Sequence, residues 1–520
     1  MTGGRLLHEL LEGDAVDPDA EAVTDGRHSL TGAQLVDRCA RFGALLADAG
    51  VRPGDRVGVH LHCSTAAMVA VHGTLRAGGV VVPLDPDAPG PHLGGLIERC
   101  DVGVVATEAP TARLAPLADA GVTTFVGGGA VDGARTVPWD ALDAVGPSPP
   151  ADLSEDDPAY IIWTSGSTGR PKGIVHTHRS ARRYAELTVD TYDLGPGDRI
   201  ASSAPLHFDQ STFDLYAGPA AGATTVMIPA PVLRFPASVT QVLADERITA
   251  WYSVPSLLVQ LHRRGALDER DLGALRWVLF GGEVYPAGQL AAMMELLPDA
   301  RFSNVYGPAE VNQCTYHHLD APPAADEIVP IGEAWDDTEL LVVDRDGRPT
   351  AHAPGELLVR TATAMRGYWD DPATTHAAFR TVDGHGDRWY ATGDLVERRD
   401  DGALVFLGRR DHQVKIRGHR VELEAVESVL LDQAGVTEAA VLPERHDDGD
   451  RLVGLVVGDA RLEGRTLVGA LRGLLPGYAV PARIVRVDHL PRTSTAKIDR
   501  SAASALLREL DGAADLLEIR

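Results

Sequence analysis

The sequence has few cysteines and no long apolar run. Its 520 residues include only 4 cysteines, none of them in CxxC spacing, so the chain shows neither a disulfide framework nor a zinc site. No stretch approaches the roughly 18–20 uninterrupted apolar residues that a membrane span requires. The N-terminus also lacks the basic start and apolar segment of a secretory signal. We therefore expect a cytoplasmic protein without a membrane partner.

Positive charge is also scarce. The chain carries 48 Lys and Arg residues against 74 Asp and Glu residues, a net charge of −26. A surface this acidic repels nucleic acid and anionic membranes, so we expect neither as a partner. Any anion-binding site must therefore be built locally, by a loop that brings its own hydrogen-bond donors.

The length and the apolar pattern indicate an α/β protein with at least two domains. Strand-like apolar runs occur at 56–62, 80–85, 102–107, 159–164, 277–282 and 339–343, and 65–79 is typical of a helix. This alternation predicts parallel sheets covered by helices, in a large N-terminal domain of residues 1–410.

The pattern changes after residue 410. Helices are expected at 421–433 and 466–475, and strands at 438–444, 451–458 and 483–490. These elements predict a small α+β domain over residues 411–520.

A loop rich in glycine and hydroxyl residues, Thr164–Gly173 (TSGSTGRPKG), follows the expected strand 159–164. Its unshielded backbone N–H groups, its hydroxyls and the charge of Lys172 can surround phosphate oxygens with donors. The loop is not a Walker A motif, because no GK[ST] stands at the required spacing. The phosphate-binding residues that we expect are Thr164, Ser165, Gly166, Ser167, Thr168, Gly169 and Lys172.

This loop resembles the signature loop of the adenylate-forming superfamily, which includes acyl-CoA ligases, luciferases and the adenylation domains of nonribosomal peptide synthetases. Further motifs similar to those of the family follow in its order: NVYGPAE (304–310), YATGD (390–394), GRRD (408–411), QVKIRG (413–418) and LPRT…KIDR (490–500). The resemblance extends from about Leu75 to Arg500. It implies that ATP and Mg²⁺ are used and that the small C-terminal domain is mobile.

The resemblance also implies residue roles on the nucleotide side. Asn304 would contact the adenine amino group, Tyr306 would pack on the base and Glu310 would ligate Mg²⁺. Asp394 would accept hydrogen bonds from the ribose hydroxyls, and Arg409, Gly282 and Glu283 would complete the nucleotide site.

Two further residues have implied roles in catalysis and domain movement. Lys497 would neutralise charge between the α-phosphate and the attacking carboxylate, together with Thr168 and Glu310, and Asp411 would be the hinge. Ala309 and Ala496 depart from the family pattern, which usually has Thr and Gly there. The missing hydroxyl at Ala309 would weaken phosphate binding by roughly 0.5–1.5 kcal/mol.

The segment HFDQSTFD (207–214) indicates which carboxylate is activated. In amino-acid-activating members of the family, a Phe-Asp pair here supplies a carboxylate for the substrate's α-ammonium group. A buried anion requires a cation, so Asp209 predicts an amino acid. By resemblance, the pocket comprises Asp209, Gln210, Phe213, Tyr252, Leu279, Gly281, Val305, Gln313, Cys314 and Lys497.

The pocket narrows the choice of substrate and leaves alternatives open. Tyr252, Leu279 and the 314–316 run resemble freestanding prolyl-adenylate ligases, whereas Gln210, Gly281 and Gln313 make the pocket more polar. We expect a small or medium neutral amino acid, proline-like first, and transfer to the phosphopantetheine thiol of a separate carrier protein. Coenzyme A is the alternative acceptor. An acyl- or aryl-CoA ligase and a non-enzymatic nucleotide-binding relative are the alternative functions.

Overall fold

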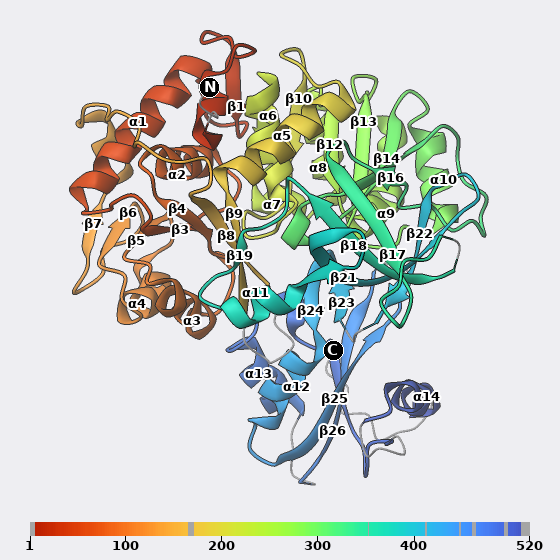
Figure 1. The fold of residues 1–520 in the computed structure, drawn as a ribbon. Helices are drawn as coiled ribbons and strands as arrows, with labels where there is room; N and C mark the ends of the chain where they lie inside the picture. Colours follow the sequence, from red (N-terminus) through yellow and green to blue (C-terminus); the bar gives the residue numbers. More distant parts are fainter. Residues whose placement is uncertain are drawn as a thin grey trace. The chain divides into compact units, whose positions relative to one another are not determined.

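The computed structural model describes residues 6–164, 171–351, 353–410, 413–446, 449–459, 464–492 and 498–510. Two compact units make up the chain (Figure 1). The larger unit comprises Met1–Pro86, Ile97–Ile162 and Gly173–Arg410, and the smaller unit comprises Asp87–Leu96, Trp163–Lys172 and Asp411–Arg520. The fold is α/β and contains a large and a small unit, as the sequence predicts.

The largest sheet has nine strands in the order β16-β15-β14-β13-β12-β10-β11-β1-β2. The strands from β14 to β1 run parallel, and β15, β16 and β2 are antiparallel to their neighbours. Their bounds are β1 Glu21–Thr24, β2 Ser29–Thr31, β10 Arg199–Ser202, β11 Thr224–Met227, β12 Ala250–Ser253, β13 Trp277–Gly281, β14 Arg301–Tyr306, β15 Thr315–Leu319 and β16 Glu333–Ala334.

The second sheet has eight strands in the order β19-β9-β8-β4-β3-β5-β6-β7. Its bounds are β3 Arg56–His60, β4 Val80–Pro83, β5 Val104–Thr107, β6 Thr124–Val126, β7 Arg135–Val137, β8 Pro158–Thr164, β9 Lys172–Thr177 and β19 Gly367–Tyr368. The strands from β8 to β7 pair in parallel. Side chains of β4 are buried along its whole length, which explains its unbroken apolar run.

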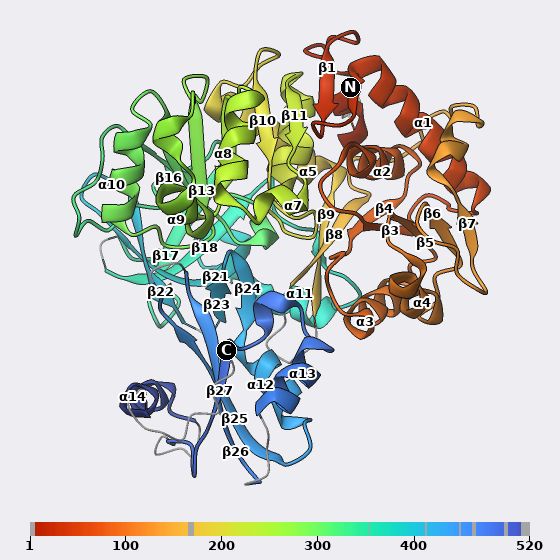
Figure 2. The same cartoon turned by 180° about the vertical axis from the view of Figure 1, so that it is seen from behind.

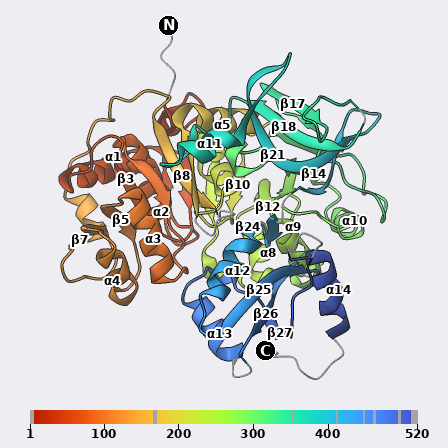
Figure 3. The same cartoon turned by 60° about the horizontal axis from the view of Figure 1, so that its bottom comes forward.

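The third sheet is antiparallel. Its strand order is β17-β18-β21-β20, and β22 also pairs with β21. Figure 3 shows β17, β18 and β21 of this sheet. Its bounds are β17 Thr338–Val343, β18 Gly355–Thr361, β20 Phe379–Val382, β21 Gly386–Arg398 and β22 Leu404–Arg409. The expected strand 339–343 therefore lies in an antiparallel sheet and does not continue the parallel pattern. Its pattern differs little from that of the parallel strands, because both are short apolar runs.

The helices cover the parallel sheets. Their bounds are α1 Gly32–Asp48, α2 Thr65–Arg76, α3 Gly90–Cys100, α4 Thr111–Asp119, α5 His178–Tyr192, α6 Gly218–Ala221, α7 Ala230–Leu233, α8 Pro236–Asp245, α9 Pro255–Arg264, α10 Ala287–Leu296 and α11 Pro372–Ala378. Short 3₁₀ turns are η1 Leu7–Glu12, η2 Trp139–Asp143, η4 Leu267–Glu269 and η5 Ala309–Val311.

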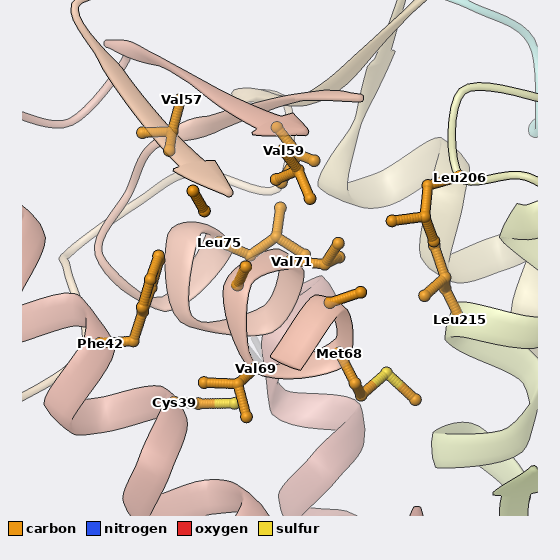
Figure 4. Packing of buried hydrophobic residues seen from close by; sticks show 14 of the residues in the cluster. Cys39, Phe42, Val57, Val59, Met68, Val69, Val71, Leu75, Leu206 and Leu215 are labelled. Carbon is orange, nitrogen blue, oxygen red and sulfur yellow. The ribbon is translucent and has the colours of Figure 1, made fainter. Parts of the chain in front are cut away.

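Helix α2 is buried on every side. Val57 and Val59 of β3 lie on one side of it, Cys39 and Phe42 of α1 on another, and Leu206 and Leu215 on a third (Figure 4). A helix that is apolar around its whole circumference belongs inside a core. The sequence of α2, TAAMVAVHGTLR, has this composition.

The two faces of the nine-stranded sheet carry different cores. Helices α8, α9 and α10 cover one face (Figure 2), where they pack on Trp251, Val278 and Phe280. On the opposite face, α5 packs with Tyr252 and Leu279. Side chains alternate across a strand, so neighbouring residues of β12 and β13 serve different cores.

The smaller unit contains a hairpin and a three-stranded sheet in the order β25-β26-β27. Its elements are β23 Gln413–Ile416, β24 His419–Glu422, α12 Leu423–Leu431, β25 Val436–Glu444, β26 Arg451–Gly458, α13 Gly464–Arg472, η6 Gly477–Ala479, β27 Arg483–Arg486 and α14 Arg500–Leu510. Leu430, Val441 and Ile484 belong to one apolar core of this unit. The expected helices and strands of the C-terminal region are all present. Strand 451–458 has the expected bounds, β25 begins two residues earlier than expected, and the other three elements are shorter.

None of the helices in the described part of the chain is both long and apolar enough to cross a membrane.

Asp214 is a fully buried carboxyl group in a short π-helical segment, η3 (Phe213–Ala217). Burial raises its pKa well above the ordinary value, although interactions with the Ser202 hydroxyl and nearby backbone amides act in the opposite direction. The folded chain therefore holds a proton that the unfolded chain releases above about pH 4. The stability that this group contributes is lost as the pH rises toward the folded-state pKa.

The Asp214→Asn substitution is expected to remove this pH dependence. As the pH rises from about 5 to about 8, the free energy of unfolding should shift in favour of the variant relative to the wild type. Urea unfolding across this range measures the difference. The exposed Asp326→Asn variant is the control, and a pH-independent difference for Asp214→Asn would show that the group is already ionised in the folded chain.

Candidate functional site

The predicted site residues of the larger unit gather at one edge of the nine-stranded sheet. Strands β10, β12, β13 and β14 run parallel, so their carboxyl ends lie at the same edge. Asp209, Gly282 and Glu310 follow β10, β13 and β14, respectively, and Tyr252 lies near the carboxyl end of β12. In open parallel sheets, ligands bind outside the carboxyl ends of the strands.

Tyr252 connects several of the predicted pocket residues. Its ring meets that of Phe213 edge-on, with centroids 5.6 Å apart, and it lies beside Leu279 in the sheet. The side-chain amide of Gln313 lies close enough to its hydroxyl to act on the pKa of Tyr252, in the lowering direction. Burial and the charge of Asp209 both raise the pKa of Tyr252, so the phenol is neutral and Asp209 lies within electrostatic reach of it.

Backbone geometry explains why the sheet carries glycine at position 281. A Cβ atom at Gly281 would lie 2.3 Å from the carbonyl oxygen of Val305 and 2.8 Å from the Tyr252 hydroxyl. Cys314 is fully buried, and its backbone N–H donates to the carbonyl of Tyr306 at 2.9 Å. The structure thus brings the described pocket residues together on the three strands β12, β13 and β14 and the loops around them.

Asp209 lies at the start of the turn that leads into η3. One carboxylate oxygen accepts the backbone N–H of Gln210 at 3.0 Å, which fixes the side chain at the turn. Asp209 is half-buried. Its carboxylate can meet a cation without the full cost of desolvating a charge in the core.

Asp394 and Tyr306 form a second polar group in the same unit. The Tyr306 hydroxyl donates to Oδ2 of Asp394 at 2.5 Å, and the guanidinium of Arg409 pairs with Oδ1. Arg409 faces Asp394 across the antiparallel pair β21 and β22. The buried carboxylate thus has an aromatic hydroxyl and a cation as neighbours, and burial and Asp394 raise the pKa of Tyr306.

Asn304 also lies on β14, but its amide has a partner within the chain. Its Nδ2 donates to the carbonyl oxygen of Pro330 at 2.7 Å. This bond fixes the orientation of the side chain.

Glu310 is fully buried in the short turn η5. The hydroxyl of Tyr368, on β19, donates to its Oε1 at 2.8 Å. The ring of His176 contacts the adjacent carbonyl of Ala309 at 2.9 Å. Burial lowers the pKa of His176 to about 4, so the ring is neutral at physiological pH.

A single carboxylate suits Mg²⁺ bound together with phosphate oxygens. Among the residues that the structure describes, no group of three or more His, Cys, Asp or Glu side chains could hold a metal ion. Mg²⁺ commonly takes one or two carboxylates, with phosphate and water completing the shell. The buried Glu310 therefore fits a metal that arrives with a nucleotide.

Gly282 and Glu283 form the turn after β13. Gly282 has a φ of +88°, a conformation that side chains with a Cβ rarely adopt. Oε2 of Glu283 accepts the backbone N–H of Ser256 at 3.1 Å, near the start of α9. A carboxylate is favourable at a helix N-terminus, so Glu283 has a local structural role here.

Several predicted residues lie at or beyond the edge of what is described. Thr164 ends β8 and Lys172 begins β9. Ser165, Gly166, Ser167, Thr168, Gly169, the hinge residue Asp411 and the catalytic candidate Lys497 lie outside the described residues.

Sequence reasoning missed Tyr368. It lies 58 positions from Glu310 in the chain, and a tyrosine within an apolar segment gives no local signal of a hydroxyl partner. The predicted role of Glu310 could have prompted a search for such a partner, because a buried carboxylate requires donors.

Two family models match the chain. One, described as AMP-binding enzyme, matches residues 12–369, and the other, described as AMP-binding enzyme C-terminal domain, matches residues 425–497.

Relatives of this chain align over nearly its whole length. An L-proline--[L-prolyl-carrier protein] ligase from Pseudomonas fluorescens is 35% identical over 517 residues, which cover 98% of this chain and 100% of the relative. A ligase with the same name from Streptomyces coelicolor is 35% identical, with 91% of each chain covered. A dimodular nonribosomal peptide synthase from Bacillus subtilis is 31% identical over 96% of this chain, and the aligned part is 21% of that synthase.

Solved structures share the fold. The amide bond synthetase McbA from Marinactinospora thermotolerans superposes with a TM-score of 0.84 at 25% identity, covering 96% of this chain and 99% of McbA. PA1221, a nonribosomal peptide synthetase protein with adenylation and PCP domains, gives a TM-score of 0.82 at 27% identity, covering 97% and 84%.

Proposed function

We propose, from the premise that this chain belongs to the AMP-binding enzyme family, that it activates a neutral amino acid with ATP and passes it to a carrier protein. In the first step, a carboxylate oxygen of the amino acid attacks the α-phosphorus of ATP. The bond to the β-phosphate oxygen breaks, pyrophosphate leaves and an aminoacyl-AMP forms. In the second step, the sulfur of a phosphopantetheine thiol attacks the carbonyl carbon and AMP leaves.

The observation that carries the amino-acid reading is the position of Asp209. Its carboxylate lies within electrostatic reach of Tyr252 in the cluster at the carboxyl edge of the sheet. An α-ammonium group is a cation that can pair with such a carboxylate. The two relatives named as L-prolyl-carrier protein ligases support this interpretation, because each aligns with at least 91% of this chain at 35% identity.

The nucleotide would be held by residues of the same unit and by the loop at 164–173. Asp394 would accept bonds from the ribose hydroxyls, with Arg409 beside it and Tyr306 against the base. Asn304, Gly282 and Glu283 would border the adenine. Lys497 would stabilise charge on the α-phosphate, and Asp411 would be the hinge of a mobile small domain.

Glu310 would hold Mg²⁺. A bound divalent cation supplies neutralising charge to phosphate oxygens. The residues of this chain bind and orient the two reactants, so that the carboxylate lies in line with the bond that breaks.

Thioester formation tests the second step. Incubation with ATP, Mg²⁺ and an activated amino acid should add one aminoacyl mass to a carrier that bears phosphopantetheine, and none to the same carrier without it. Mass spectrometry of the intact carrier measures the addition. Rapid acylation of coenzyme A with no acylation of any carrier would favour the alternative function, a CoA ligase.

Tyr368→Phe is expected to raise the Mg²⁺ concentration for half-maximal activity about 3- to 10-fold, because one hydrogen bond that orients Glu310 is lost. Titration of Mg²⁺ in pyrophosphate exchange measures this, and electron paramagnetic resonance of Mn²⁺ measures metal binding directly. Tyr285→Phe, which removes another buried tyrosine hydroxyl, is the control. An unchanged midpoint and unchanged Mn²⁺ binding would show that Tyr368 does not position Glu310.

A further inference from the structure

Two buried glutamines have amide atoms without partners. Gln210 is 8% exposed and Gln313 is 6% exposed. Nε2 of Gln210, a donor, and Oε1 of Gln313, an acceptor, are buried and have no hydrogen-bond partner in the described structure. Leaving such an atom unpaired in a protein interior is energetically costly. Few buried polar atoms in proteins lack a partner, so each of these points to a ligand or a functional role.

Both glutamines belong to the cluster around Tyr252. The side-chain amide of Gln313 lies close enough to the Tyr252 hydroxyl to act on its pKa. The ring of Phe213 packs edge-on against Tyr252, and the backbone N–H of Phe213 donates to the carbonyl of Gln210 at 3.1 Å. Gln210 directly follows Asp209, the proposed partner of the α-ammonium group. Both glutamines thus lie next to the aromatic pair formed by Phe213 and Tyr252.

The chemistry of the two atoms defines what would satisfy them. A hydroxyl group can accept a hydrogen bond from Nε2 and donate one to Oε1, and a primary amide can do the same. An apolar side chain can do neither, so binding it would leave both atoms buried and unpaired. Sites with buried polar groups discriminate strongly against ligands that leave those groups unpaired.

We propose that Gln210 and Gln313 select an amino acid whose side chain carries a hydroxyl or amide group, such as a hydroxylated cyclic amino acid. This inference rests on the proposed function and names its substrate class. We expect a compact side chain, because Phe213, Tyr252 and Leu279 all belong to one buried apolar cluster.

Three pairs of similar shape test the proposal in pyrophosphate exchange: 4-hydroxy-L-proline with L-proline, L-threonine with L-valine, and L-asparagine with L-leucine. In the pair whose skeleton fits, the polar member should have a kcat/KM at least about 10-fold higher. Gln210→Leu and Gln313→Leu should each lower this ratio about 10-fold, whereas Gln289→Leu, outside the cluster, should leave it unchanged.

The proposal is overturned if the apolar member is used equally well or better in every pair. It is also overturned if folded Gln210→Leu and Gln313→Leu proteins keep the wild-type ratio. The comparison of polar with apolar substrates needs only the wild-type protein, so the proposal can still be tested if a variant fails to fold. Failure of the proposed function gives a different result, in which no amino acid of either kind supports exchange.

Discussion

Replacing Asp209 with asparagine is expected to lower kcat/KM for amino-acid-dependent pyrophosphate exchange about 100-fold. The loss corresponds to about 3 kcal/mol, the low end for breaking a buried charge pair, because Asp209 is only half-buried. The KM for ATP should remain near the wild-type value, since Asp209 is assigned to the amino acid. Exchange kinetics with each substrate varied in turn measure both effects.

A substrate without the α-nitrogen shows whether Asp209→Asn loses activity because a charge pair is missing or because the protein structure is damaged. Cyclopentanecarboxylate resembles proline but has no ammonium group, so Asp209→Asn should not reduce its already low activity. The exposed Asp326→Asn variant should behave like the wild type with both compounds. Full activity of Asp209→Asn on amino acids would contradict the assignment, and high wild-type activity on the simple carboxylate would favour an acyl-CoA ligase.

Lys497→Ala is expected to lower kcat for adenylate formation about 100- to 1,000-fold, with KM values for ATP and amino acid changed only a few-fold. The reason is that a cation at the α-phosphate stabilises charge that develops mainly in the transition state. Single-turnover measurements of aminoacyl-AMP formation test this directly.

The second step provides the internal control for Lys497. Transfer from chemically prepared aminoacyl-AMP to a carrier should continue in Lys497→Ala at a near wild-type rate. The charge that Lys497 stabilises develops at the α-phosphate during adenylate formation, which this reaction bypasses. Lys415→Ala, an exposed lysine of the same unit, should retain normal exchange. Equal losses in both steps would indicate that Lys497 acts through folding and does not act at the α-phosphate.

Much of the fold could be predicted from local patterns. Strands β4 and β13 are unbroken apolar runs because both faces of a parallel sheet are buried. The antiparallel sheet was not predicted. Its long strand β21, Gly386–Arg398, includes the TGD motif, and from Tyr390 to Val396 it alternates buried and partly buried residues. Pairing β18 with β21 joins residues 31 to 41 positions apart, such as Val359 with Tyr390 and Gly355 with Val396, and no local pattern specifies that partner.

The residues of the candidate site also fall into two groups, those that a local sequence motif predicts and those that it does not. The motifs predicted Glu310, Asp394 and Asp209 as site residues, because each lies in a segment similar to a motif of the family. The hydroxyl of Tyr368 on Glu310 and the burial of Asp214 depend on residues brought together by folding, so neither has a local signal. Sequence comparison marked Gln210 and Gln313 as unusual, but only the structure shows that each keeps an unpaired amide atom.

Incorporation of labelled pyrophosphate into ATP by the purified chain tests amino-acid adenylation most directly. With ATP, Mg²⁺ and a panel of amino acids that includes hydroxylated and cyclic members, at least one neutral amino acid should support rapid exchange. The same reaction should be lost when Mg²⁺ is removed or when Asp209 is replaced by asparagine. Tight ATP binding without exchange for any member of the panel would contradict the proposed function.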